Sequence, residues 1–137
     1  PVRVSDEFIN SSQIAGTSPG WIAFDTKAPR GALTTEVVQF LDKLDHFLKS
    51  QPNVSYTYSV AAYVKRMNLV LNDMNPEELR VPQTQDQVTS INDEGQQETF
   101  EVDGNALIEQ HIMMFENGGG SDLQNVLNAD NPKALTL

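Results

Sequence analysis

Cysteine is absent from the 137 residues. This absence excludes disulfides, thiolate nucleophiles and cysteine-bound zinc. Basic residues are also few: 9 Lys and Arg stand against 19 Asp and Glu, which gives a formal net charge of −10. Such a balance argues against nucleic acid and anionic membranes as partners, because both require basic patches.

Long apolar runs are missing as well. No stretch approaches the roughly 18–20 residues of a membrane-spanning helix, and no basic start followed by an apolar stretch resembles a signal peptide. We therefore expect any spanning or targeting segment to lie outside these residues. The length fits one domain, and the hydrophobic share of 39% allows a modest core.

The first half of the chain predicts a strand, a helix and a second strand. Residues 20–26 alternate in polarity and predict a short strand. Apolar residues then recur at steps of three and four, which predicts a helix over 35–50 that Thr34 or Thr35 caps and that Gln51-Pro52-Asn53 ends. Residues 54–59 alternate again and predict the second strand.

Two more helices are predicted downstream. The first covers residues 60–74, with Ser59 as its N-cap. Asn75-Pro76-Glu77-Glu78 then carries the features of a fresh helix start. The other helix runs over 105–117 and ends at Gly118. In the first of these helices the predicted apolar face consists of Val60, Tyr63, Val64, Met67, Val70, Leu71 and Met74, and the predicted solvent face of Lys65, Arg66, Asn68 and Asn72.

Between these helices lies an acidic segment, residues 83–103, with few apolar residues. We interpret it as a long, mobile loop. Within it, residues 88–91 and 99–102 can pair as a small hairpin around the turn Asp93-Glu94-Gly95.

The end of the chain begins with three glycines. Ser121 then caps a predicted short helix that runs through Leu127, and residues 132–137 predict a returning strand. The predicted fold is thus α+β, with 14–59 as a β-α-β unit and 60–131 as a mostly helical insertion that carries the acidic loop.

No constellation of residues predicts a catalytic, cofactor or metal site. His46 lies one helical turn from Asp42, which is typical of a surface pair, and His111 faces or edges the core. The glycine-rich stretch at 118–120 matches no phosphate-binding motif. The remaining candidates fit a solvated loop and core filling better than ligands; they are the acids Asp93, Glu94, Glu98, Glu101 and Asp103, and the methionines Met67, Met74, Met113 and Met114.

One segment carries a resemblance. "FLKSQPNV" followed by "YSVAAYVKRMN" resembles the helix, turn, strand and helix of the first extracytoplasmic loop in exporters of the resistance–nodulation–division (RND) superfamily. The similar branch is related to the mycobacterial membrane protein large family. "SQIAGTSPGWIAFDT", "RVPQ" and "NALIEQHIMMFENGGGSDLQNVLNADNPKALTL" extend the resemblance over most of residues 14–137.

The resemblance implies a ferredoxin-like core and a porter subdomain on the periplasmic side of the bacterial inner membrane. It implies a non-enzymatic part of a proton-driven exporter of hydrophobic or amphiphilic molecules such as lipids and drugs. Its partners would be the transmembrane helices and second periplasmic loop of the same transporter, its substrate, and further copies in an oligomer. The sequence names no substrate-binding residue. The alternative is a soluble α+β interaction or ligand-binding module that uses its acidic loop against a basic partner.

A ferredoxin-like arrangement makes a specific expectation about strand order. Strands 20–26 and 54–59 should run parallel with a gap between them, and residues 133–137 should fill that gap antiparallel to both. Ile22, Phe24, Leu135 and Leu137 should then reach the core against helix 35–50. The outer edge of strand 20–26 would be left unpaired, which invites association with another chain.

Overall fold

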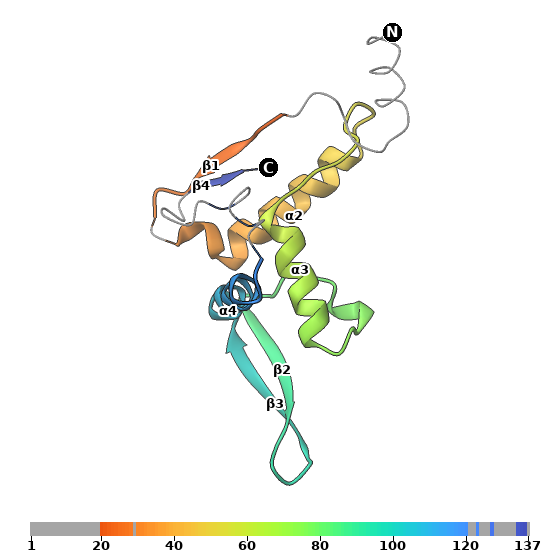
Figure 1. Ribbon diagram of the computed structural model, residues 1–137, viewed down its shortest axis with the longest axis vertical. Helices are drawn as coiled ribbons and strands as arrows, with labels where there is room; N and C mark the ends of the chain where they lie inside the picture. The colour runs from red at the N-terminus through yellow and green to blue at the C-terminus, as the bar shows by residue number, and fades with distance from the viewer. Residues whose placement is uncertain (1–19, 29, 121–122, 124–126, 128–133, 137) are drawn as a thin grey trace.

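The computed structural model describes residues 20–28, 30–120, 123, 127 and 134–136, and these form an α+β fold (Figure 1). Three helices and an antiparallel hairpin make up most of it. In chain order the elements are β1 (Ala23–Asp25), η1 (Gly31–Leu33), α2 (Thr35–Lys49), α3 (Val60–Leu71), η2 (Pro76–Glu78), β2 (Gln85–Ile91), β3 (Gln97–Asp103), α4 (Gly104–Asn117) and β4 (Ala134–Thr136).

The helices predicted over 35–50, 60–74 and 105–117 are confirmed, and most of their ends are too. The short helix predicted from Ser121 through Leu127 lies largely outside the described residues. Thr34 Oγ1 accepts a hydrogen bond from the Val37 N–H and caps α2. Asp103 does the same for α4, where its Oδ1 accepts from the Asn105 N–H at 2.9 Å. Asn75 caps the short 3-10 helix η2 through the Glu77 N–H. Ser59 stands at the N-cap of α3 in an extended conformation, but its side chain makes no capping bond.

The faces of α3 differ from the prediction. Its buried residues are Val60, Ala61, Val64, Asn68 and Leu69. Asn68 is therefore inside, whereas Val70 is 48% exposed and Leu71 is 42% exposed. The helix also ends at Leu71, three residues before the predicted end at Met74. Asn68 is buried because its side chain hydrogen-bonds to Glu78 of η2, and η2 lies against this end of α3.

A single apolar cluster joins the three helices. α2, α3 and α4 contact one another, and residues from η1 and from the chain near β2 complete the cluster. Burying each large aliphatic side chain contributes about 1.5–3 kcal/mol before the loss of conformational entropy is subtracted. The buried members are Ala32, Leu33, Val38, Leu41, Val60, Ala61, Val64, Val81, Ile108, Ile112, Leu123 and Leu127.

The acidic segment is a regular hairpin rather than the predicted long loop. Its pairing runs from Gln85 opposite Asp103 to Ile91 opposite Gln97, well beyond the predicted 88–91 and 99–102. The turn is held by Asn92, whose Oδ1 accepts from the N–H groups of Glu94 and Gln96, and by Gly95 at φ 77°. Backbone pairing needs no apolar side chains, so polar composition did not prevent strand formation. The insertion at 60–131 is therefore not mostly helical in its middle part.

The returning strand is confirmed where it is described. β4 pairs antiparallel with β1, and Phe24 lies opposite Leu135. Residues 132, 133 and 137 of the predicted strand lie outside the described residues. Phe24 packs against the core and against the ring of Phe40, with centroids 5.7 Å apart. Ile22 was expected in the core but is 41% exposed.

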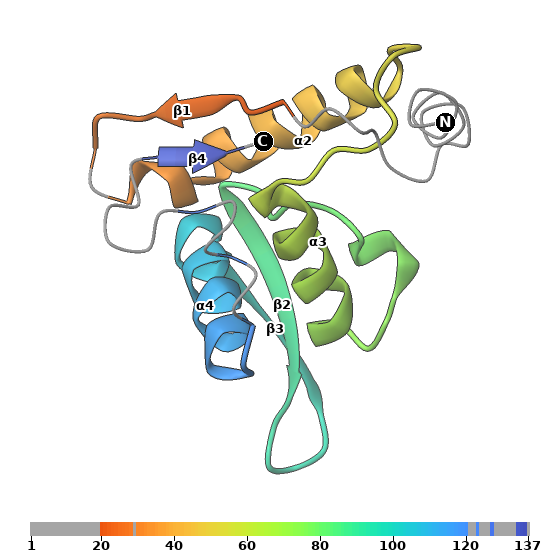
Figure 2. The ribbon, with the colours of Figure 1, turned by 45° about the horizontal axis from the view of Figure 1, so that its top comes forward.

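Residues 54–59 were predicted as a strand, and this prediction is wrong. They run without strand pairing between α2 and α3 (Figure 2). Side-chain packing, rather than pairing with a neighbouring strand, holds this segment in position. Tyr58 packs on Tyr63, with ring centroids 5.5 Å apart, and Tyr63 packs on Phe115 at 4.9 Å. The described residues thus form two separate two-stranded sheets and no ferredoxin-like sheet.

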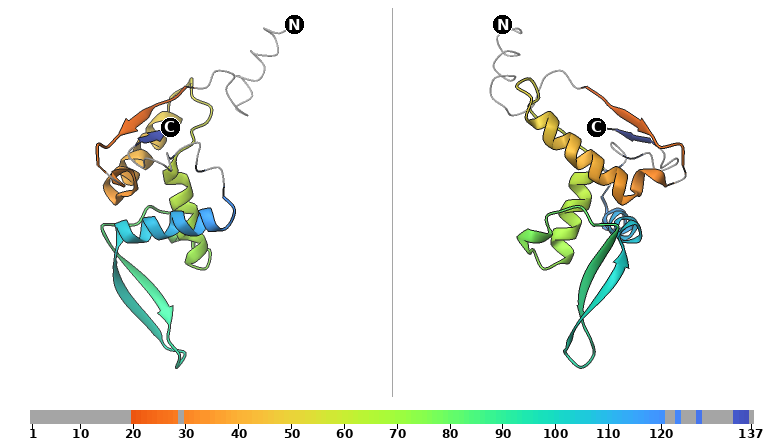
Figure 3. Two further views of the ribbon diagram at one scale, coloured as in Figure 1. Left: turned by 60° about the vertical axis from the view of Figure 1, so that its left-hand side comes forward. Right: turned by 180° about the vertical axis from the view of Figure 1, so that it is seen from behind.

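The elements leave the hairpin projecting from the rest. α2 runs beside the β1–β4 pair, while the β2–β3 turn points away from the helices in every view (Figure 3). Over the described stretches of the chain, no helix has the length and apolar character needed to cross a membrane.

Candidate functional site

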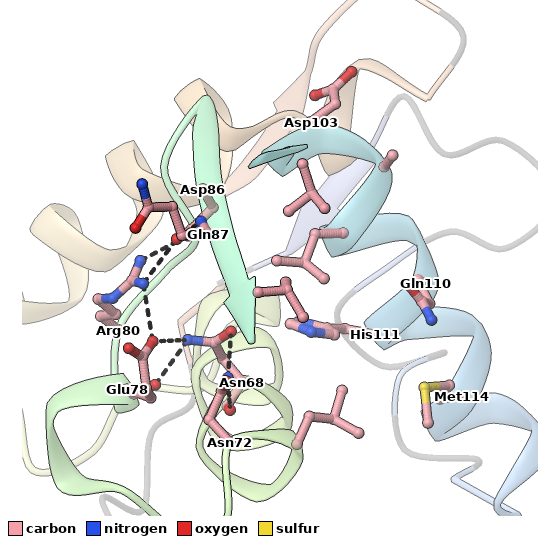
Figure 4. Close-up of a pocket in the computed structure, with 15 residues that line it drawn as sticks. Asn68, Asn72, Glu78, Arg80, Asp86, Gln87, Asp103, Gln110, His111 and Met114 are labelled. Carbon is pink, nitrogen blue, oxygen red and sulfur yellow. Dashed lines mark hydrogen bonds and ion pairs between the residues drawn. The ribbon is translucent and has the colours of Figure 1, made fainter. Parts of the chain in front are cut away.

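A pocket of about 520 Å³ lies between α3, α4 and the base of the hairpin (Figure 4). This volume falls in the usual range for small-molecule sites, about 300–1,000 Å³. The lining residues are Asn68, Leu71, Asn72, Glu78, Arg80, Asp86, Gln87, Val88, Val102, Asp103, Ala106, Leu107, Gln110, His111 and Met114. They divide into a polar end and an apolar wall.

The polar end is built around Arg80, which follows η2. Its guanidinium donates two hydrogen bonds to the carboxylate of Asp86, at 2.7 and 2.8 Å. Its Nη2 also lies 2.9 Å from Glu78 Oε2. One cation is thus shared between two carboxylates, and the paired charges keep Arg80 in a fixed position.

Asp86 is the second residue of β2 and is buried. Its hydrogen bonds from Arg80, and further bonds from the N–H groups of Gln83 and Gln87, lower its pKa to about 2 although burial opposes this. The pKa of Arg80 is raised, chiefly by the same hydrogen bonds to Asp86. Both groups are therefore charged at any physiological pH.

Two asparagines extend the polar end: Asn68 on α3, and Asn72 at the C-cap of that helix. Asn68 Nδ2 donates to the backbone oxygen of Glu78 at 2.9 Å and to its Oε2 at 3.1 Å. Asn72 Nδ2 donates to the Asn68 carbonyl at 2.8 Å. These bonds connect α3 to η2 and give one side of the pocket a fixed set of amide groups.

His111 enters the pocket from α4. Its side chain is 1% exposed, and its Nδ1 has no hydrogen-bond partner among the described residues. Burial lowers its pKa, and the nearby charge of Asp86 offsets only part of this effect. His111 is therefore neutral at neutral pH. The prediction that it faces or edges the core is confirmed. The sequence did not predict that it lines a pocket.

The apolar wall lies across from the polar end. Leu71 of α3, Val88 and Val102 of the hairpin, and Leu107 and Met114 of α4 supply it. Val88 and Val102 lie on the same face of the hairpin as Asp86, because residues two apart in a strand share a face.

The other candidates from the sequence lie away from this pocket, except Asp103 and Met114. His46 is exposed, with its Nε2 3.9 Å from Asp42 Oδ1, as expected of a surface pair. Asp93, Glu94, Glu98 and Glu101 lie exposed on the hairpin. The interpretation of the methionines as core filling is wrong for Met74, Met113 and Met114, which are exposed.

The remaining expectations concern glycines and metals. Gly118 caps α4 as predicted, and Gly119 has φ 88°. Ser121, which would open the helix beyond them, is outside the described residues. Within the described ranges, no group of three or more His, Asp or Glu side chains could hold a metal ion.

The sequence did not predict the pocket. The signal that could have pointed to it is the pair Asn68 and Asn72, which sits one helical turn apart on an otherwise apolar end of α3. Nothing in the spacing of residues joins that pair to Asp86 and His111, because the hairpin and α4 meet α3 only in the tertiary fold.

Comparison with known proteins finds no matching protein-family model, no matching curated protein and no matching solved structure.

Proposed function

We propose that this chain is the extracytoplasmic porter part of a proton-driven RND-type exporter in the bacterial inner membrane. It would bind hydrophobic or amphiphilic molecules and pass them on, without catalysing a reaction. The transmembrane helices and second periplasmic loop of the same protein would be its partners. The ferredoxin-like core belongs to the same proposal and requires residues 54–59 to join a sheet with β4 in the intact exporter.

The observation that carries the proposal is the layout of residues 35–71. α2 ends at a Gln51-Pro52-Asn53 turn, an extended segment follows, and Ser59 opens α3 directly. This is the order of elements on which the resemblance to RND exporters rests. The segment 54–59 is extended but unpaired, so the support lies in the helix order and in the Ser59 junction.

The pocket supports a binding role rather than catalysis. Its apolar wall and polar end suit a molecule that has both kinds of surface. Among the described residues that line it there is no Ser, Thr, Cys or Lys to act as a nucleophile.

A second candidate follows from the hairpin. It projects from the helices (Figure 3) and exposes the acids Asp93, Glu94, Glu98 and Glu101. This arrangement favours an interaction module that binds a basic partner.

Reading the coding sequence around residues 1–137 distinguishes the two candidates. The exporter proposal expects apolar segments of at least about 18 residues directly on both sides. A short reading frame without such segments would contradict the exporter and favour the interaction module.

A further inference from the structure

The charge balance of the pocket selects the ligand that it can hold. Three carboxylates, Glu78, Asp86 and Asp103, line it together with the single cation Arg80. Arg80 is already bound to Glu78 and Asp86. Because His111 is neutral, the lining keeps a negative excess, which favours a cationic head group over an anionic one.

The hydrogen-bonding groups agree with this sign. His111 Nδ1 is buried and has no partner among the described residues. Its imidazole points from α4 toward Asn68 on α3, across the pocket (Figure 4). A buried imidazole nitrogen without a partner is destabilising unless a ligand supplies one. An ammonium group has three donors and no acceptor, so it can donate to Nδ1 when the imidazole proton is on Nε2.

The rest of the pocket suits an alkyl tail. Leu71, Val88, Val102, Leu107 and Met114 line it opposite the polar end. We propose that this pocket binds an amphiphile with a primary ammonium head and an alkyl tail, with the head beside His111 Nδ1 and attracted by the carboxylate charge of the polar end, to which Glu78 belongs. The inference rests on the proposed function in taking amphiphiles as the ligand class, and it adds the charge and the position of the head.

Calorimetric titration of the full chain tests this with three probes below their micellar concentrations. Dodecylammonium carries both parts of the ligand, dodecyl sulfate reverses the head charge, and butylammonium shortens the tail. We expect one saturable site for dodecylammonium, at least about tenfold tighter than for either other probe. Equal binding of dodecyl sulfate, equal binding of butylammonium, or no saturable binding would overturn the proposal.

Two pairs of variants localise the binding. Ala106→Phe narrows the pocket from α4 and should weaken dodecylammonium binding at least about tenfold, whereas Met113→Phe, on an exposed part of the same helix, should not. Glu78→Gln should weaken it about threefold to tenfold, whereas Glu94→Gln makes the same charge change on the hairpin turn and should leave it unchanged. An unaffected affinity in Ala106→Phe would place the site elsewhere and refute the proposal.

Circular dichroism confirms that each variant is folded. If Glu78→Gln unfolds, His111→Phe removes the nitrogen acceptor at similar size and should weaken dodecylammonium binding by a similar factor. Unchanged affinity in His111→Phe would contradict the assigned head position. Binding is measured on the purified chain, whereas the exporter proposal is tested on the flanking coding sequence. Either proposal can therefore fail while the other is upheld.

Discussion

At the scale of single residues, Asp86 receives four hydrogen bonds, two from Arg80 and one each from the N–H groups of Gln83 and Gln87. A buried carboxylate is stable only with such partners. The pair also fixes Arg80 over Glu78, so it organises the polar end of the pocket.

Replacing Asp86 by Ala should therefore destabilise the fold, since it leaves Arg80 half-buried with fewer partners and frees the two N–H groups. We expect a loss of about 2–3 kcal/mol in the free energy of unfolding, measured by urea denaturation. Asp93→Ala on the exposed hairpin turn is the control and should change it by less than about 0.5 kcal/mol. Similar losses in both variants would refute the role given to Asp86.

The free energy of unfolding should decrease as pH is lowered through two separate ranges. The pKa of His111 is lowered by burial from its ordinary 6.5, so the unfolded chain binds its proton first and stability is lost as pH falls below about 6.5. The pKa of Asp86 is about 2 rather than 3.8, so its contribution, roughly 2 kcal/mol, is present above 3.8 and is lost as pH falls toward 2.

Urea denaturation at pH 7.5 and 5 checks the first of these pH ranges. His111→Phe removes the titrating group and should flatten the fall in stability between pH 7.5 and 5. His46→Gln, at the exposed histidine of α2, is the matched control and should retain it. An unchanged fall in His111→Phe would contradict this assignment.

The sequence predicted the burial of a residue correctly where the periodicity of its own helix determines that burial. The spacing of His111 from Leu107 and Ile108 placed it toward the core. Asn68 was assigned to the solvent face because amides are usually exposed. Its burial depends on Glu78, which returns to α3 through the turn after the helix, and spacing along α3 carries no information about that contact.

At the scale of elements, the junction of β3 and α4 is a point of close backbone approach. Gly104 donates its N–H to the Thr84 carbonyl at 3.0 Å. A Cβ at this position would overlap the carbonyl oxygen of Gln83 and crowd Thr35 Cγ2. The hairpin base, α2 and α4 meet here, so the junction sets how the hairpin wall faces the pocket.

Gly104→Ala should cost about 2–4 kcal/mol of unfolding free energy, because backbone atoms rather than a flexible side chain must move. Thermal or urea denaturation measures it. Gly20→Ala is the control, since a Cβ there meets open space. Equal stability of the two variants would contradict the close approach seen at Gly104.

The outer half of the hairpin should be the most mobile internal part of the described chain. Beyond Val88 and Phe100 its side chains are mostly polar and exposed, so little packing offsets the entropy of ordering. Amide hydrogen exchange should be fast from Thr89 to Glu98 and slow in the middle of α2. Protection of the hairpin tip equal to that of α2 would contradict this prediction.

The elements show which patterns a sequence reveals. Helical periodicity predicted α2 and α4, and residue types predicted the caps at Thr34 and Gly118 but not the N-cap Asp103. The turn around Gly95 marked the hairpin. Strand pairing was harder, because a strand exists only if another segment lies beside it. Residues 54–59 have the alternation of a strand, yet no strand among the described residues lies beside them. Tyr58 of this segment packs instead on Tyr63 of α3. Pairing of β1 with β4 was predicted because the ferredoxin-like arrangement, which the resemblance implies, places the last strand beside the first.

At the scale of the whole molecule, the pocket lined by Arg80 and His111 and the projecting hairpin lie beside a small helical core. We propose that this part of the protein lies on the periplasmic side of the inner membrane. The absence of cysteine from the chain makes that location directly measurable, because a single introduced thiol would be the one reactive site within these residues.

The most direct test is labelling of Glu94→Cys, at the exposed hairpin turn, in the full-length protein within its own cells. A membrane-impermeant maleimide is applied to spheroplasts with the inner membrane intact, and the unsubstituted protein serves as the control for thiols elsewhere in the sequence. The account predicts that intact spheroplasts label Cys-substituted protein as fully as lysed ones. Labelling only after lysis would place the hairpin in the cytoplasm and contradict the proposed function.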